Sequence, residues 1–136
     1  MPRIVVSLSQ RRLYLFEGSR LIRSYPVGIG RIASRTPTGR YTIINKVPYP
    51  YSWPGGPLSA YGTLWMGLSR PGYGIHGTNR PDSIGQMVSR GCIRMHNEDV
   101  EDLGRRVGIG TQVIIQEGPV GASVRRHTSD ADPLPQ

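Results

Sequence analysis

Chemistry in this chain of 136 residues centres on one thiol. Cys92 is the sole cysteine, and it follows a glycine in the polar stretch VSRGCIRMHNED rather than in an apolar run. An ordinary thiol has a pKa near 8.5 and is only about 3% ionised at pH 7, so a nucleophilic cysteine needs a neighbouring base. A neutral imidazole can take that proton. The residue types therefore favour a Cys–His pair, although a lone cysteine is more commonly inert.

Three histidines could act as the base. His127 lies in a tail without hydrophobic periodicity, and His96 lies only four residues after Cys92, near the start of a candidate helix. His76, in YGIHGTN, ends the short strand candidate at 73–75. A histidine at a strand end is held rigidly and can still face a cleft. We therefore expect His76 to be the general base.

The neighbours of the thiol could stabilise charge. Backbone N–H groups of Gly91 and Cys92 could point at the oxygen of an attacked carbonyl, and glycine permits the tight turn that such an oxyanion site needs. Arg90 and Arg94 would add positive potential, which lowers a thiol pKa and attracts a carboxylate. This arrangement indicates acyl transfer.

Two other classes of site compete with this interpretation. A zinc site from His76, Cys92 and His96 is conceivable, but the chain has no second thiol, no CxxC pair and no HxxxH spacing. We therefore expect no metal and no other cofactor. A non-catalytic module that binds cell wall or nucleic acid is the second alternative, and the Cys–His pair argues against it.

Short β-branched and aromatic runs between Gly and Pro turns predict a mainly β fold. Two short helices are plausible, one over 82–88 and one with Asn97 as its N-cap. We expect a single-domain β-sandwich or partial barrel of mixed strands with one or two short helices. The strand candidates are residues 3–9, 13–16, 21–27, 40–47, 64–68, 73–75 and 111–116.

The length fits one domain with its own core. We expect this domain to span residues 1–118 and a disordered C-terminal tail to span 119–136, which lacks periodicity. The segment 48–62 is rich in Pro, Gly and aromatic residues, and it is long enough to form a flap over the site. One cysteine excludes an internal disulfide.

The charge indicates an anionic partner. The net charge is +8, with Lys46 as the only lysine. The arginines are scattered rather than interleaved with aromatic residues on one element, so we do not expect nucleic acid. No apolar run approaches the ~18 residues of a membrane span, and none near the N-terminus reaches the about 7–15 residues of a secretory signal. The oligomeric state is left open.

The stretch IHGTNRPDSIGQMVSRGCIRMHNEDV resembles the signature of the L,D-transpeptidase catalytic domain (YkuD-like) family, in which HGT is followed after a spacer by [S/T]-x-G-C. Upstream, VSLSQRRLYLFEGSRLIRSYPVGIG is similar to the family's opening strands. RTPTGRYTI is similar to its Thr-Pro-x-Gly turn and the strand after it. The resemblance runs from about Ile4 to Glu117.

This resemblance implies a cysteine-dependent L,D-transpeptidase that forms 3→3 cross-links in peptidoglycan. Cys92 would attack the carbonyl between the third residue and the terminal D-alanine of a tetrapeptide stem. The side-chain amine of a neighbouring stem's third residue, commonly meso-diaminopimelate, would resolve the thioester. Water as acceptor would make the protein an L,D-carboxypeptidase instead. His76 matches the family's general base, and Gly91 with Cys92 matches its backbone oxyanion site.

The resemblance also assigns supporting residues. Ser89 matches the family's Ser/Thr position and would shape the loop by hydrogen bonding. Many members carry histidine at Arg90 and asparagine at Arg94, so Arg94 could bind a stem carboxylate here. Gly77 has no side chain, so a main-chain oxygen should orient the His76 ring. The expected substrate-binding or site-shaping residues are Ser89, Arg90, Arg94, Gly77 and Asn79.

The family's substrate fixes an expected location. Peptidoglycan lies outside the cytoplasmic membrane, so the resemblance implies work in the cell wall, the periplasm or a spore wall. It also implies a role in wall biogenesis and cell shape, and a thiol that carbapenems acylate. The positive charge is consistent with a wall rich in anionic polymers.

Overall fold

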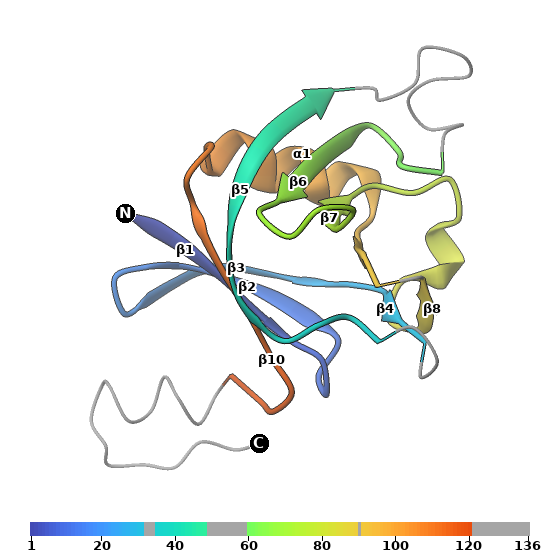
Figure 1. The fold of residues 1–136 in the computed structure, drawn as a ribbon, viewed down its shortest axis with the longest axis horizontal. Helices are drawn as coiled ribbons and strands as arrows, with labels where there is room; N and C mark the ends of the chain where they lie inside the picture. The colour runs from blue at the N-terminus through green and yellow to red at the C-terminus, as the bar shows by residue number, and fades with distance from the viewer. Residues whose placement is uncertain (32–34, 49–59, 90, 121–136) are drawn as a thin grey trace.

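The computed structural model describes residues 1–31, 35–48, 60–89 and 91–120 (Figure 1). A main sheet, a small second sheet, one α-helix and one 3-10 turn account for its regular elements in these ranges. The main-sheet strands are β1 (Pro2–Ser7), β2 (Arg12–Glu17), β3 (Arg20–Pro26), β5 (Gly39–Pro48), β6 (Leu64–Leu68), β7 (Gly74–His76), β9 (Ile93–Arg94) and β10 (Gln112–Gln116). The remaining elements are β4 (Ile29–Gly30), β8 (Met87–Ser89), the 3-10 turn Pro81–Ser83 and α1 (Asn97–Arg106).

The main sheet is mixed and curled. Its strand order is β3-β2-β1-β10-β5-β6-β7-β9. The pairs β1–β10 and β7–β9 are parallel, and the other neighbouring pairs are antiparallel. The long strand β5 sweeps around the molecule from β10 to β6 (Figure 1). This half-barrel with one helix confirms the predicted mainly β fold.

The helix closes one side of the curled sheet. α1 packs against β6 and β7, and Val100 and Leu103 are fully buried, with Val107 following in the core. Their spacing of three and four residues puts them on one helix face. Acidic residues occupy the first turn and two arginines the last turn, as the helix dipole favours. The sequence predicted this amphipathic pattern.

Two local predictions are wrong. A helix over 82–88 does not form, because Gly85 adopts φ +88° after the single 3-10 turn and the following residues pair as β8 with β4. A left-handed residue ends a right-handed helix. Asn97 is not the N-cap of α1 but its first residue, and the capping position belongs to His96.

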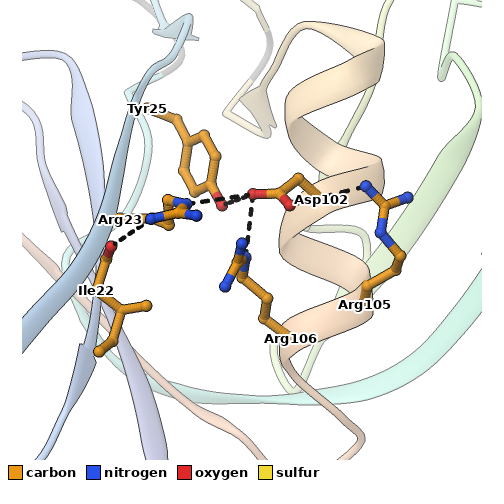
Figure 2. A network of polar contacts seen from close by, with 6 residues as sticks. All are labelled: Ile22, Arg23, Tyr25, Asp102, Arg105 and Arg106. Atoms are coloured by element: carbon orange, nitrogen blue, oxygen red, sulfur yellow. Dashed lines mark hydrogen bonds and ion pairs between the residues drawn. The ribbon is translucent and has the colours of Figure 1, made fainter.

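A polar network joins the sheet's β3 edge to α1 (Figure 2). The Tyr25 hydroxyl on β3 donates to Asp102 Oδ2 over 2.6 Å. Arg106 Nε donates to the same oxygen over 3.1 Å, and Arg23 and Arg105 lie within 4 Å of the carboxylate. β3 lies at the opposite end of the strand order from β7 and β9, so only the curl of the sheet brings it to this helix.

The described C-terminal segment packs on the domain. Val120 is buried with Val5 and Phe16, and its N–H donates to Gln10 Oε1 over 3.1 Å. Residues 121–136 of the expected tail and 49–59 of the expected flap lie outside the described residues. Within the described ranges, no helix has the length and hydropathy to cross a membrane.

Candidate active site

Two parallel strands at one edge of the main sheet carry the predicted Cys–His pair. β7 pairs with β9 so that Ile75 lies opposite Ile93 and His76 lies opposite Arg94. Cys92 directly precedes Ile93, and His76 directly follows Ile75, so each of the two residues adjoins one of the fully buried, paired isoleucines. The register therefore brings the predicted nucleophile and base to neighbouring segments, with Cys92 just before β9 and His76 at the end of β7.

The Cys92 thiol is half-buried against the backbone of the turn before β7. Its sulfur lies 3.7 Å from the Gly72 carbonyl oxygen. Burial raises the pKa of the thiol, and a backbone hydrogen bond at Gly74 and the charge of Arg94 only partly offset this. The charge of Arg94 lowers the thiol pKa as expected, but desolvation has the larger effect, so the net pKa is raised.

The His76 imidazole is buried and oriented by its own backbone. Nδ1 lies 2.5 Å from the Gly77 carbonyl oxygen. A carbonyl only accepts, so Nδ1 carries the hydrogen and Nε2 keeps a lone pair. Burial, aided by the charge of Arg94, lowers the pKa of His76 to about 4 although the Gly77 hydrogen bond opposes this. The predicted main-chain partner is confirmed, and the ring is neutral at pH 7.

Two aromatic rings enclose this imidazole, and sequence reasoning missed both. Trp65 lies opposite His76 on β6 and stacks on its ring at 5.5 Å between centroids. Tyr61 meets the imidazole edge-on at 5.0 Å and Trp65 at 5.2 Å. A Cβ on Gly74 would come within 2.7 Å of the Trp65 ring, so glycine there leaves room for the indole. The alternation of Trp65 with buried neighbours in LWMGL was the available signal.

Asn97 fixes the backbone on both sides of the histidine. Its Oδ1 accepts the N–H of Thr63 over 3.2 Å and that of Thr78 over 3.0 Å. These residues begin the segment entering β6 and the segment leaving β7. A Cβ on Gly62 or Gly77 would overlap this amide oxygen, so the two glycines make its approach possible. The sequence predicted Asn97 as a helix cap and did not predict its role as an acceptor for these two N–H groups.

The loop before Cys92 is held by Ser89. The buried Ser89 hydroxyl donates to the Cys92 carbonyl over 2.8 Å and accepts the Gly91 N–H over 3.1 Å. This confirms the loop-shaping role. Gly91 has φ +124°, and a Cβ there would meet the Tyr73 ring. Because its N–H is engaged by Ser89, the expected Gly91 half of the oxyanion site is not presented in this structure. Arg90 lies outside the described residues.

One predicted site residue, Asn79, lines a hollow that neither Cys92 nor His76 borders. Asn79 is exposed and shares this hollow of about 510 Å³ with Thr63, Thr78 and residues at the start of α1. Arg94 instead lines an open hollow of about 390 Å³ together with Arg31 and Arg80. Across the described residues, no three His, Cys, Asp or Glu side chains are placed to share a metal ion.

Known proteins share both the sequence and this architecture. Residues 1–115 match the sequence model of the L,D-transpeptidase catalytic domain. The Bacillus licheniformis protein named as the L,D-transpeptidase YkuD is 52% identical over 113 residues, covering 83% of this chain and 64% of its own length. Its Bacillus subtilis namesake is 48% identical over 112 residues, covering 82% and 64%. The chain thus spans less than two thirds of these relatives.

Solved structures agree. The crystal structure of an L,D-transpeptidase from Mycobacterium tuberculosis H37Rv superposes with a TM-score of 0.70 at 26% identity, covering 85% of this chain and 58% of that one. The likeness therefore extends over most of the chain. With most of its length inside the shared domain, the chain belongs to the L,D-transpeptidase catalytic domain family.

Proposed function

We propose that this protein is a cysteine-dependent L,D-transpeptidase that forms 3→3 cross-links in peptidoglycan. The observation that supports the proposal is the pairing of β7 with β9, in which Cys92 directly precedes β9 and His76 ends β7, together with the contact of His76 Nδ1 with the Gly77 carbonyl. That contact leaves Nε2 as the free basic nitrogen. Family membership supports the class of substrate.

The first half-reaction forms a thioester. The Cys92 sulfur attacks the carbonyl carbon between the third stem residue and the terminal D-alanine, and His76 Nε2 takes the thiol proton. The C–N bond then breaks, and the imidazolium returns that proton to the departing D-alanine amine. Both groups are neutral at rest, so the proton moves as the sulfur attacks. The Cys92 N–H is the remaining backbone donor for the tetrahedral oxygen.

The second half-reaction transfers the acyl group. The side-chain amine of a neighbouring stem's third residue attacks the thioester, His76 takes a proton from it, and the thiol regains its hydrogen as the C–S bond breaks. Water in place of the amine yields a trimmed stem, which is L,D-carboxypeptidase activity. The proposal places the working protein outside the cytoplasmic membrane, where its net charge of +8 suits an anionic wall.

The test compares matched variants on purified muropeptide tetrapeptides. We expect Cys92→Ala and His76→Gln to abolish 3→3 dimers measured by mass spectrometry, and His96→Gln to retain them. The wild-type thiol should also gain the mass of one carbapenem, and Cys92→Ala should gain none. Dimer formation by Cys92→Ala would refute the proposal. Release of D-alanine without dimers, even when acceptor is in excess, would assign the carboxypeptidase reaction instead.

A further inference from the structure

A hollow lined by Arg94 gathers positive charge. Three arginines line its volume of about 390 Å³ with one carboxylate, and the charged and polar residues of this lining are Arg31, Arg80, Arg94, Asp82, Ser83 and Gln86. Arg94 is the second residue after Cys92 and lies on β9 opposite His76. The guanidinium and the thiol also interact electrostatically. The hollow is therefore linked to the thiol through Arg94, although Cys92 is not among its lining residues.

One nitrogen of the Arg94 side chain, Nε, is buried without a hydrogen-bond partner among the described residues. None of the ion pairs among the described residues includes Arg94 or Arg80, whereas Arg105 and Arg106 on α1 both pair with Asp102. Burial and the charges of Arg80 and Arg31 lower the pKa of Arg94. A buried guanidinium of this kind is completed by an anion.

The frame around the hollow is fixed by backbone contacts. Gly28 and Arg94 exchange two main-chain hydrogen bonds of 2.7 and 2.9 Å. A Cβ on Gly28 would lie 2.9 Å from the Ser83 carbonyl oxygen, so glycine lets the segments meet. Arg80 is anchored by its N–H on Thr78 Oγ1 and by its carbonyl, which accepts from the Ser83 hydroxyl. The backbone that carries Arg80 and Arg94 is thus held by hydrogen bonds within the chain.

We propose that this hollow is a carboxylate subsite, which binds a free carboxylate of the stem peptide while Cys92 attacks the adjoining carbonyl. The inference rests on the proposed function. Guanidinium groups bind carboxylates through two parallel hydrogen bonds, which fixes orientation as well as charge. Asp82 in the lining disfavours a dianionic phosphate and leaves a monoanionic carboxylate as the better fit. A tetrapeptide stem offers its terminal carboxylate and, with diaminopimelate, a side-chain carboxylate.

The experiment measures binding, so it needs no turnover. In a Cys92→Ala background, the tetrapeptide is titrated by calorimetry into protein carrying Arg94→Gln, Arg80→Gln or the control Arg40→Gln, an exposed arginine of β5. We expect the first two changes each to weaken binding by about 10- to 100-fold and the control by less than about twofold. Arg80 is exposed, so its variant tests the subsite without disturbing the core.

Two peptide analogues identify which carboxylate is bound. One carries a C-terminal amide, and the other has lysine in place of diaminopimelate. The analogue that lacks the bound carboxylate should bind to the protein with intact arginines as weakly as the parent peptide binds to Arg94→Gln. Its affinity should not fall further when it is titrated into Arg94→Gln. Unchanged affinity in both arginine variants, or full affinity of both analogues, overturns the subsite. Inorganic phosphate serves as a competing probe. Arginine variants that lose affinity for phosphate but keep their affinity for the peptide also overturn the subsite. If the peptide binds as expected but the wild-type protein shows no turnover, the proposed function is refuted and the carboxylate subsite is still supported.

Discussion

At the scale of single residues, burial sets the protonation of the site. It raises the pKa of the Cys92 thiol and lowers that of the His76 imidazole to about 4. The resting pair is therefore neutral rather than a thiolate–imidazolium ion pair. A neutral pair costs less to keep away from water than an ion pair does, and in the proposed reaction the thiolate would form only as the sulfur attacks.

The rings around His76 control its titration, and this gives a prediction. We expect Trp65→Leu to admit water to the imidazole and raise its pKa toward the ordinary value near 6.5, because desolvation is the main cause of the lowering. A base works only when deprotonated, so the acid limb of kcat/KM, near pH 4 in wild type, should move upward. An NMR titration of the His76 ring reads the same shift directly.

The control for this prediction keeps an aromatic ring stacked on the His76 imidazole. Trp65→Phe retains an aromatic face against the imidazole, so its acid limb should stay closer to that of wild type. An unchanged His76 pKa in Trp65→Leu would show that other groups exclude water from the ring.

At the scale of elements, one amide joins the approaches to β6 and β7. We expect Asn97→Ala to lower the free energy of unfolding by about 1–3 kcal/mol, because two N–H groups lose their acceptor. Turnover should fall as well, since the segment after His76 is no longer fixed. Urea unfolding and kcat measured on the same samples check both effects.

Asn97→Asp is the matched variant. A carboxylate oxygen can accept the same two N–H groups of Thr63 and Thr78, so this change should restore most of the stability. Equal losses in the alanine and aspartate variants would mean that packing, rather than the accepted hydrogen bonds, accounts for the role of Asn97.

At the scale of the whole molecule, the curl of the sheet is fastened by Tyr25 and Asp102 (Figure 2). We expect Tyr25→Phe and Asp102→Asn to show a coupling energy of about 1 kcal/mol in a double-mutant cycle of unfolding free energies. Tyr14→Phe, which removes a hydroxyl bonded to the neutral Gln10 amide, is the control and should not couple with Asp102. Additive losses would contradict a direct contribution of this contact.

The coupling should depend on pH in a fixed direction. The hydrogen bonds from Tyr25 and Arg106 hold the pKa of Asp102 below its usual value. A depressed carboxyl pKa stabilises the folded state above the unfolded pKa near 4, and this stabilisation is lost as the pH falls through the folded value. The coupling energy should therefore be constant from neutral pH to about pH 5 and shrink below about pH 4.

Patterns of local origin were predictable from the chain. The strand at 64–68 and the apolar face of α1 follow from alternation and helical spacing, and both occur as expected. The strands β4 and β8 were not predicted, because two or three residues carry no period. Composition allowed a helix over 82–88, but the left-handed turn at Gly85 prevents it.

The sequence by itself determined the family and predicted Cys92 and His76 as the reacting pair, because a lone Cys92 after glycine and His76 in HGT are local features. Only the tertiary structure decided the protonation of that pair, the aromatic enclosure by Trp65 and the convergence of arginines beside Arg94. Desolvation and long-range contacts depend on which segments meet across a curled sheet. Residues far apart in the chain set these quantities, and local spacing does not encode them.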